Sequence, residues 1–453
     1  MKTTYAIALI VLIALSVFAY AIQPRRDLGG KLPLVWTSDD NPARRQQIDL
    51  FNAEYPQYSL ELDPNNTGME KVIVQAIAGV GPDLFDCYSH AQLVAYVKAG
   101  VACDITDRYE KEGISLDEIW PVVYPNFVHE GKIYGHPTNA ATDAIWYNKD
   151  VFDACGEPYP EGDWTWEEFI EVAQRLTKRR EDGRVEHFGY LSNRAEWYPM
   201  IRQFGGQIYS DDGTHCVIDS PEAIQALQLL QDLTYVHDVM PSPNQEAAMA
   251  AAGGWGSGTI TLFGGGKGAM AHGGRWWLCL MREQYPDLRL GVTEMPHGPK
   301  KVFWGYGRAT LVNALAPNPD HAWNFIKFEH EEPYNQLVND QADALAPVIS
   351  FSQGTKFLHN PSFPKEDYNQ TWFDVMEDGV PRESSPFIHG PVADRIINNQ
   401  LDLLRNKEKT AEEVCRDIQL KTDKAIKKRL REEPKLLPRY EELVAAQAEA
   451  RIQ

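Results

Sequence analysis

The sequence predicts an α/β protein with two lobes, each built on a central mixed sheet flanked by helices. Its 453 residues are too many for one ordinary hydrophobic core, so two lobes or domains are expected. Before Ile133, strand-like and helix-like segments alternate, an order typical of parallel or mixed sheets. After Phe152 the chain is rich in helix-forming and tryptophan-containing segments. These observations place a change of lobe between the two residues.

The stretch 133–152, IYGHPTNAATDAIWYNKDVF, is where we expect that change. Gly135 and Pro137 break regular structure at its start. Small and polar residues continue to Asp143, and an apolar segment over 144–147 follows. We interpret the stretch as a strand that leaves one lobe, crosses a hinge and enters the other. Periodicity also allows an ordinary strand, loop and strand inside one domain.

The elements of the first lobe follow from apolar patterns and helix-breaking residues. Asn41-Pro42 predicts a helix start, because asparagine caps a helix and proline suits its first position. Ligands bind beyond the carboxyl ends of strands in such sheets, so we expect 36–40 and 87–90 at the mouth of this lobe. Strands are predicted over 32–36, 58–62 and 82–86, and further helices over 69–79 and 91–99.

Two capping boxes mark helices in the remainder of the chain. Thr165 with Glu168, and Thr410 with Glu413, have the spacing of this motif. Strands are also predicted over 188–190 and 301–313, and helices from Ser220 and over 318–329, 391–405 and 410–430. Residues 431–453 are charged and interrupted by proline, and we expect a surface tail there.

Composition excludes several classes of function. The net charge of −20 argues against nucleic acid or anionic lipid as the main partner. Residues 264–268, GGGKG, lack the serine or threonine of a phosphate-binding loop, and the twelve histidines show no HExxH zinc motif. We therefore expect no catalytic residues, no metal and no cofactor. Twelve tryptophans and twenty tyrosines either fill cores or line a cleft of sugar size.

The N-terminal residues have the pattern of an export signal. Residues 5–22 are apolar or small, and Ala19-Tyr20-Ala21 fits a cleavage site, so a signal peptide over 1–21 is expected. An uncleaved membrane anchor is the alternative, since the apolar run is barely long enough to span a bilayer.

The six cysteines are dispersed and form no CxxC or zinc spacing. Cys87 with Cys103 is the one pair that we consider for a disulfide. A disulfide between lobes would lock the hinge.

The motifs GKIYGHP, WYNKDVF and TWEEFIEVAQRLT, in this order, resemble the extracellular solute-binding proteins of ABC importers. The resemblance is to the sugar-binding group that includes maltose-binding protein, and it extends from the first strand to about residue 430. It implies a periplasmic-binding-protein type II fold with hinge crossovers. It also implies a periplasmic or extracellular monomer that binds a mono- or oligosaccharide and delivers it to a permease with a cytoplasmic ATPase.

The resemblance gives boundaries for the lobes. The first lobe would comprise 31–139 and 305–347, and the second 140–304 and 348–430, with 431–453 as the tail. The chain would cross back at 303–307 and again near Ala346-Pro347.

The resemblance also nominates binding residues, since a sugar needs aromatic platforms beside groups that bond hydroxyls in pairs. For each residue an ordinary structural role is the alternative: a helix-cap cluster for Asp39 and Asp40, core packing for Trp276, and a salt bridge between lobes for Arg308. Trp276 falls on the family's glycine-x-tryptophan, where Arg275 replaces a proline. The candidates are Trp36, Asp39, Asp40, His90, Asp143, Glu196, Trp197, Tyr198, Trp276, Tyr306 and Arg308, with Trp372 a weaker one.

Two other functions remain open from the sequence. A secreted glycoside hydrolase would need two carboxylates at a fixed separation, and no pattern designates such a pair. A clamp for a polyamine or peptide would also suit an acidic, aromatic cleft.

Overall fold

The computed structural model describes residues 28–64, 68–192, 194–249 and 258–450, without the side chains of 448–450. The expected signal peptide over 1–21 lies outside the described residues. In the part of the chain that is described, no helix combines the length and apolar character needed to cross a membrane.

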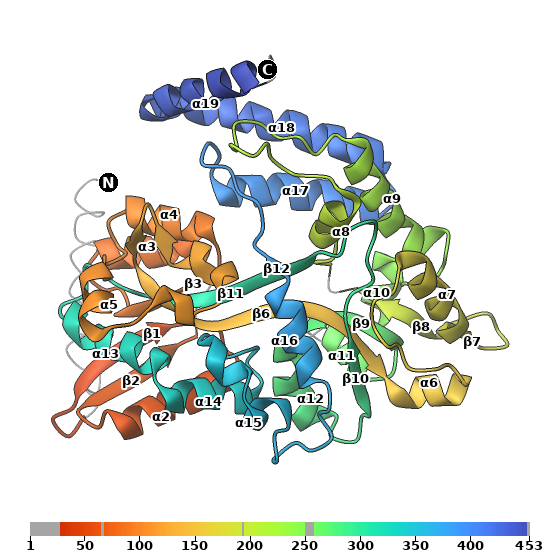
Figure 1. Cartoon of the computed structure of the whole chain (residues 1–453), viewed down its shortest axis with the longest axis horizontal. Helices are drawn as coiled ribbons and strands as arrows, with labels where there is room; N and C mark the ends of the chain where they lie inside the picture. The colour runs from red at the N-terminus through yellow and green to blue at the C-terminus, as the bar shows by residue number, and fades with distance from the viewer. Residues whose placement is uncertain (1–27, 65–67, 193, 250–257, 451–453) are drawn as a thin grey trace, which may run out of the picture.

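One sheet runs through both halves of the molecule (Figure 1). Its strand order is β2-β1-β3-β11-β6-β9-β8-β7, with β10 paired to β6 and β12 to β11. The pairs β1–β2, β1–β3 and β8–β9 are parallel, whereas β11 is antiparallel to both β3 and β6. The sheet is therefore mixed, as the alternation of strand and helix patterns predicted.

Two groups of elements lie at the two ends of this sheet, and we call them lobe 1 and lobe 2 (Figure 1). Lobe 1 contains β1 (Leu32–Thr37), β2 (Tyr58–Asp63), β3 (Leu84–Cys87), α2 (Ala43–Glu54), α3 (Met69–Ile77), α4 (His90–Lys98), α5 (Thr106–Glu112), η2 (Pro121–Asn126), β4 (Val128–His129), β5 (Lys132–Ile133), α13 (Pro319–His330) and α14 (Glu332–Gln341).

Lobe 2 carries most of the remaining elements. They are α6 (Lys149–Cys155), α7 (Trp166–Leu176), β7 (Lys178–Arg179), β8 (Val185–Leu191), α8 (Trp197–Phe204), α9 (Pro221–Tyr235), α10 (Pro243–Met249), α11 (Thr259–Gly264), β9 (Gly268–Gly274), η3 (Arg275–Trp277), α12 (Leu278–Gln284), β10 (Leu290–Thr293), α17 (Gly390–Arg405), α18 (Ala411–Glu432) and α19 (Leu437–Ala450). The helices α15 (Thr355–Leu358) and α16 (Asn369–Glu377) lie below β6 in Figure 1, and β12 is Gly379–Val380.

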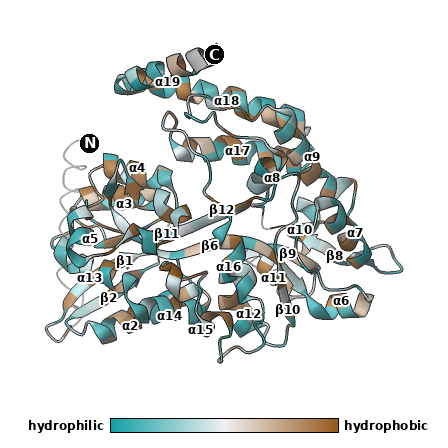
Figure 2. Ribbon diagram, viewed as in Figure 1, coloured by the Kyte–Doolittle hydropathy of each residue, from teal (hydrophilic) through white to brown (hydrophobic). Residues whose placement is uncertain are grey.

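Two long strands, β6 (Gly135–Asn148) and β11 (Phe303–Val312), connect the lobes. All fourteen residues of β6 are buried. Because successive side chains point to opposite faces of a strand, Trp146 packs in one hydrophobic cluster and Ile145 and Tyr147 in the other. Figure 2 shows hydrophobic and hydrophilic residues together on α2, α17 and α18, as amphipathic helices require.

Local sequence signals account for several helix starts. Both predicted capping boxes form, Thr165 with Glu168 on α7 and Thr410 with Glu413 on α18. The helix expected at Asn41-Pro42 begins at Ala43, and the side chain of Asn41 accepts the backbone N–H of Ala43.

The segment expected as a surface tail continues α18 to Glu432 and then forms α19. Its described side chains are exposed or half-buried, and Tyr440 packs against Phe387 with ring centroids 5.1 Å apart. The disulfide considered from the sequence is corrected by the structure. All six cysteines are free, so Cys87 and Cys103 form no disulfide.

Candidate functional site

A groove of about 360 Å³ lies between the two lobes. We call it the central groove. Lobe 1 contributes the start of α4 and part of η2, while lobe 2 contributes the segment 381–394. Trp304, Gly305 and Tyr306 of β11 line it between the lobes. The groove therefore contacts both lobes and the strand that connects them.

Two aromatic side chains on β11 pack against each other in the central groove. Trp304 and Tyr306 stand two residues apart, so they project from the same face of the strand. Their ring centroids are 4.6 Å apart, with 34° between the ring planes. Both are half-buried, and Tyr198 of α8 contacts Trp304 from lobe 2 with 6.3 Å between ring centroids.

A chain of hydrogen bonds holds Tyr306 in position. Its hydroxyl donates to Asp143 Oδ1 at 2.8 Å and accepts from Trp276 Nε1 at 3.0 Å. Gly274 makes this possible, because a Cβ there would lie 2.4 Å from Trp276 Nε1 and 3.0 Å from the Tyr306 hydroxyl. Burial, with Asp143 nearby, raises the pKa of Tyr306 well above its ordinary value, so the hydroxyl stays protonated.

The lobe 2 wall of the central groove is fixed by α8. The Tyr198 hydroxyl donates to Pro381 O at 2.9 Å and accepts from Glu383 N at 3.1 Å, and burial raises its pKa to about 12. Arg382 lies over the Trp197 ring at 5.0 Å and forms an ion pair with Asp394 at 3.0 Å. Tyr198 and Trp197 thus position the segment 381–394, which carries Arg382 and Asp394.

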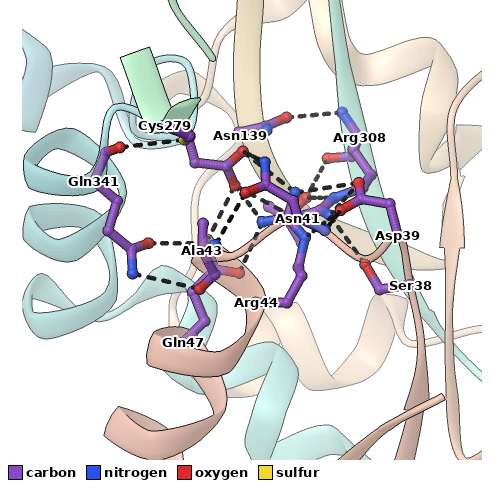
Figure 3. Close-up of polar contacts among 12 residues, drawn as sticks. Ser38, Asp39, Asn41, Ala43, Arg44, Gln47, Asn139, Cys279, Arg308 and Gln341 are labelled. Carbon is purple, nitrogen blue, oxygen red and sulfur yellow. Dashed lines mark hydrogen bonds and ion pairs between the residues drawn. The ribbon is translucent and has the colours of Figure 1, made fainter. Parts of the chain in front are cut away.

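A buried charge cluster lies in lobe 1, where β1, β3 and β11 meet α2 and α14 (Figure 3). Arg308 Nη1 donates to Ser38 Oγ at 3.0 Å and lies 3.3 Å from Asp39 and 3.4 Å from Asp86. Arg308 Nε donates to Thr138 Oγ1 at 2.8 Å. The cluster consists of Asp39, Arg44, Asp86, Arg308 and Asp343.

The charges in this cluster stabilise one another. Burial opposes ionisation of Asp39, but Arg44 and Arg308 outweigh it and lower its pKa to about 2. The same balance lowers the pKa of Asp343. For Asp86, burial outweighs the attraction of Arg308 and raises the pKa. Arg308 itself has its pKa raised well above the ordinary value, since three carboxylates overcome the cost of burial.

Tyr88 connects the buried charge cluster to the central groove. Its side chain lines the groove and is 39% exposed. Its hydroxyl lies 3.1 Å from Asp86 Oδ2 and 3.2 Å from Asp39 Oδ2, as a donor that these carboxylates share. Burial and the neighbouring carboxylates raise the pKa of Tyr88 well above its ordinary value.

The structure places the eleven candidate residues in different surroundings. Tyr306 and His90 line the central groove, and His90 Nδ1 lies 3.0 Å from Pro125 O. Asp143, Trp276, Trp197 and Tyr198 stand behind its walls and hold them in place. Trp36, Asp39 and Arg308 belong to lobe 1's interior, where Trp36 Nε1 donates to Asp86 Oδ1 at 2.9 Å.

Two candidates lie away from the central groove. Asp40 is exposed beside Asp39. Glu196 is fully buried, accepts from Ser192 and lies 3.9 Å from His272. Trp372 is also fully buried, with its ring centroid 5.2 Å from that of Trp146.

Several groove residues were not named as binding candidates from the sequence. Tyr88, Tyr209 and residues of the segment 381–394 line the central groove. Tyr88 lies within 87–90, which the strand end placed at the mouth of lobe 1, but it was not singled out there. The segment 381–394 follows β12 and carries no motif that would have distinguished it from a surface loop. Among the described residues, no group of three or more His, Cys, Asp or Glu side chains is arranged to hold a metal ion.

A groove between two lobes joined by crossing strands defines a two-lobed solute-binding protein. The chain belongs to the bacterial extracellular solute-binding protein family, whose sequence model matches residues 37–328. A putative binding protein from Brucella abortus is 24% identical over 321 residues, 69% of this chain and 74% of the relative. An arabinooligosaccharide-binding protein from Bacillus subtilis is 23% identical over 311 residues, 62% of this chain and 65% of the relative.

Solved structures show the same fold. An ABC substrate-binding protein from Listeria monocytogenes in complex with cycloalternan has a TM-score of 0.75 at 23% identity, over 87% of this chain and 98% of that one. The maltose-bound MalE3 protein of T. maritima has a TM-score of 0.70 at 21% identity, over 87% and 99%. The expected type II periplasmic-binding-protein fold is confirmed.

Proposed function

We propose that this protein captures a neutral mono- or oligosaccharide in the central groove and delivers it to a membrane permease of an ABC importer. The pair Trp304 and Tyr306 carries the proposal. Their half-buried rings stack on each other with centroids 4.6 Å apart, and the ring faces left towards the groove would provide the apolar surface that the CH faces of a sugar need. Relatives and neighbours named for arabinooligosaccharide, cycloalternan and maltose support this class of ligand.

The buried charge cluster favours a neutral ligand over an acidic sugar. Arg308, named from the sequence as a binding candidate, is the cation that a sugar carboxylate would need, but it is only 2% exposed. Its guanidinium already contacts Ser38, Asp39, Asp86 and Thr138. Drawing it towards a ligand would leave buried carboxylates without their counter-ion, at a cost of several kcal/mol. Arg308 therefore acts as the structural partner of the carboxylates.

Binding without hydrolysis fits the carboxylates of the groove. A glycosidase needs one carboxyl group that carries a proton and a second that attacks or activates water. In the central groove, Glu383 lies 2.6 Å from Arg202, and its Oε2 accepts the backbone N–H groups of Ile208 and Tyr209. Asp394 pairs with Arg382 at 3.0 Å. These side chains hold the wall of the groove together.

The remaining assignments are part of the same proposal. The protein would be exported with cleavage after Ala21, act as a periplasmic or extracellular monomer, and meet a permease with its ATPase. Lobe boundaries at 139/140 and 304/305 are supported by β6 and β11, because both positions fall inside these connecting strands. Residues 348–430 would complete lobe 2.

A thermal-shift panel tests the proposal. Maltotriose, arabino-oligosaccharides and mannotriose represent neutral sugars, galacturonate an acidic one, and spermidine and a short peptide the other ligand classes. We expect a rise in melting temperature with a neutral sugar, lost in Trp304→Ala and kept in Tyr159→Ala, an exposed aromatic outside the groove. A response confined to spermidine, the peptide or galacturonate would contradict the proposal.

A further inference from the structure

Two helices from opposite lobes touch at the edge of the central groove. Ala91 lies in the first turn of α4, and Gly390 is the first residue of α17. A Cβ built on Gly390 would lie 1.9 Å from Ala91 Cβ and 3.3 Å from Ala91 Cα. Neither neighbouring atom is the end of a flexible side chain. Any side chain at position 390 would therefore push α17 away from α4.

A second contact joins the same helix to lobe 2. Lys98 Nζ lies 3.4 Å from Glu433 Oε2, and Glu433 is the residue that follows α18. Glu433 Oε1 is held within lobe 2 by His389 Nε2 at 3.2 Å and Arg429 Nε at 3.1 Å. Because Lys98 stands about two helical turns after Ala91, both residues lie on the same face of α4.

These contacts are separate from the strands that connect the lobes. Ala91 and Gly390 also line the central groove, so the helices meet where a ligand would lie. We take it, as part of this inference, that the lobes part to admit a ligand of sugar size. The α4 contacts with α17 and Glu433 must then break, although β6 and β11 remain paired.

We infer that Ala91 and Lys98, with Gly390 and Glu433, form a latch between the lobes. The latch opens to admit the ligand, and Gly390 sets how closely the lobes can approach when it closes. The inference rests on the proposed function, because it takes the central groove as the binding site. Contacts that favour the closed arrangement raise ligand affinity by raising the population of the binding-competent state.

The two parts of the latch contribute differently. The side chains of Lys98 and Glu433 are 38% and 23% exposed, so their ion pair is screened by solvent. Such a pair changes the equilibrium between the open and closed arrangements of the lobes by about fivefold at most. The contact at Gly390 is steric. It sets how closely the backbones of α4 and α17 can approach, and salt concentration does not change it.

Small-angle scattering of the unliganded full chain tests the steric part. We expect the unliganded protein to exchange between open and closed arrangements, and Gly390→Ala to lose the closed one, so its radius of gyration should be larger than that of the unaltered protein. Gly354→Ala is the matched control, because Gly354 has an extended backbone at φ −78° and no atom within 4 Å of its would-be Cβ. An unchanged radius of gyration in Gly390→Ala would overturn the latch.

A second pair of variants keeps the test decisive if Gly390→Ala fails to fold. Lys98→Glu places like charges opposite each other, and we expect faster hydrogen exchange at the amides of α4 and at the start of α17. Lys111→Glu makes the same change of charge on the exposed end of α5 and should leave those rates unchanged. Equal hydrogen-exchange rates at these amides in Lys98→Glu and Lys111→Glu would overturn the latch.

The outcomes separate the latch from the proposed function. If no sugar shifts the melting temperature but Gly390→Ala and Lys98→Glu open the lobes, the latch stands and the sugar assignment falls. If a sugar binds and neither variant alters lobe separation or exchange, the sugar assignment stands and the latch is wrong.

Discussion

Tyr306 of β11 and Asp143 of β6 lie diagonally across these paired strands, and the tyrosine hydroxyl donates to Asp143 Oδ1 at 2.8 Å. The bond ties β11 to β6 beside the central groove. Trp276 Nε1 donates to the same hydroxyl, so one oxygen links the two strands with η3 of lobe 2. Tyr306, an aromatic residue of the groove, is thereby held by the strands that connect the lobes.

Removing that hydroxyl should weaken the fold. We expect Tyr306→Phe to lower the free energy of unfolding by about 1–3 kcal/mol, since a hydrogen bond to a buried carboxylate is lost. Urea denaturation measures the change. Tyr159→Phe also deletes a tyrosine–carboxylate hydrogen bond, to Asp153 at 2.6 Å, but on the exposed surface, and should lower the free energy of unfolding by much less. Equal costs in the two variants would contradict this role for Tyr306.

A methyl group at position 274 should displace Trp276. Gly274→Ala brings a Cβ into the space of Trp276 Nε1, so the indole must move and its bond to Tyr306 must break. We expect a loss of sugar affinity of about tenfold or more, measured by calorimetry, together with lower stability. Gly354→Ala serves as the control and should change neither. Unaltered affinity in Gly274→Ala would show that Trp276 does not support the groove.

Arg308→Lys tests the buried charge cluster. Lysine carries the same charge but cannot reproduce the several contacts that the planar guanidinium makes with Ser38, Asp39 and Thr138. We expect the free energy of unfolding to fall by about 3–5 kcal/mol. Arg289→Lys alters an exposed arginine paired with Asp150 and Asp153, and it should change the free energy of unfolding far less, because solvent screens exposed ion pairs. A small effect at Arg308 would refute its structural role.

Asp39 makes stability depend on acid pH. Its pKa is lowered from 3.8 to about 2 in the folded protein, so its ionised form favours folding above about pH 4. This contribution, roughly 2 kcal/mol, is lost as pH falls from about 4 towards 2. We expect Asp39→Asn to flatten the stability profile in that window, measured by urea denaturation at each pH. An unchanged profile in Asp39→Asn would contradict the assignment.

Local patterns predicted the elements well where short-range chemistry decides them. The capping boxes at Thr165 and Thr410 and the apolar segment of β6 gave their elements directly from the sequence. The helix α19 was not predicted, because its charges and prolines indicated a surface tail; its described side chains are indeed exposed or half-buried, and Tyr440 packs on Phe387.

The site was harder to predict because its geometry depends on distant residues. Arg308 is surrounded by carboxylates from β1, β3 and the end of α14, and nothing in the neighbouring sequence reveals them. Arg275, which replaces a proline of the family, turns away from the groove and donates to the carbonyl groups of Ala344 and Asn339. Its neighbour Trp276 supports Tyr306, a role that its place in the motif does not distinguish from stacking on a ligand.

Small-angle scattering during a titration with the sugar that stabilises the protein most tests the central claim directly. The account predicts that the radius of gyration falls as the sugar saturates the groove, because the lobes close on it, and that Trp304→Ala requires far more sugar for the same change. A neutral sugar that binds with no change in the radius of gyration, or with equal affinity in Trp304→Ala, would contradict capture between the lobes.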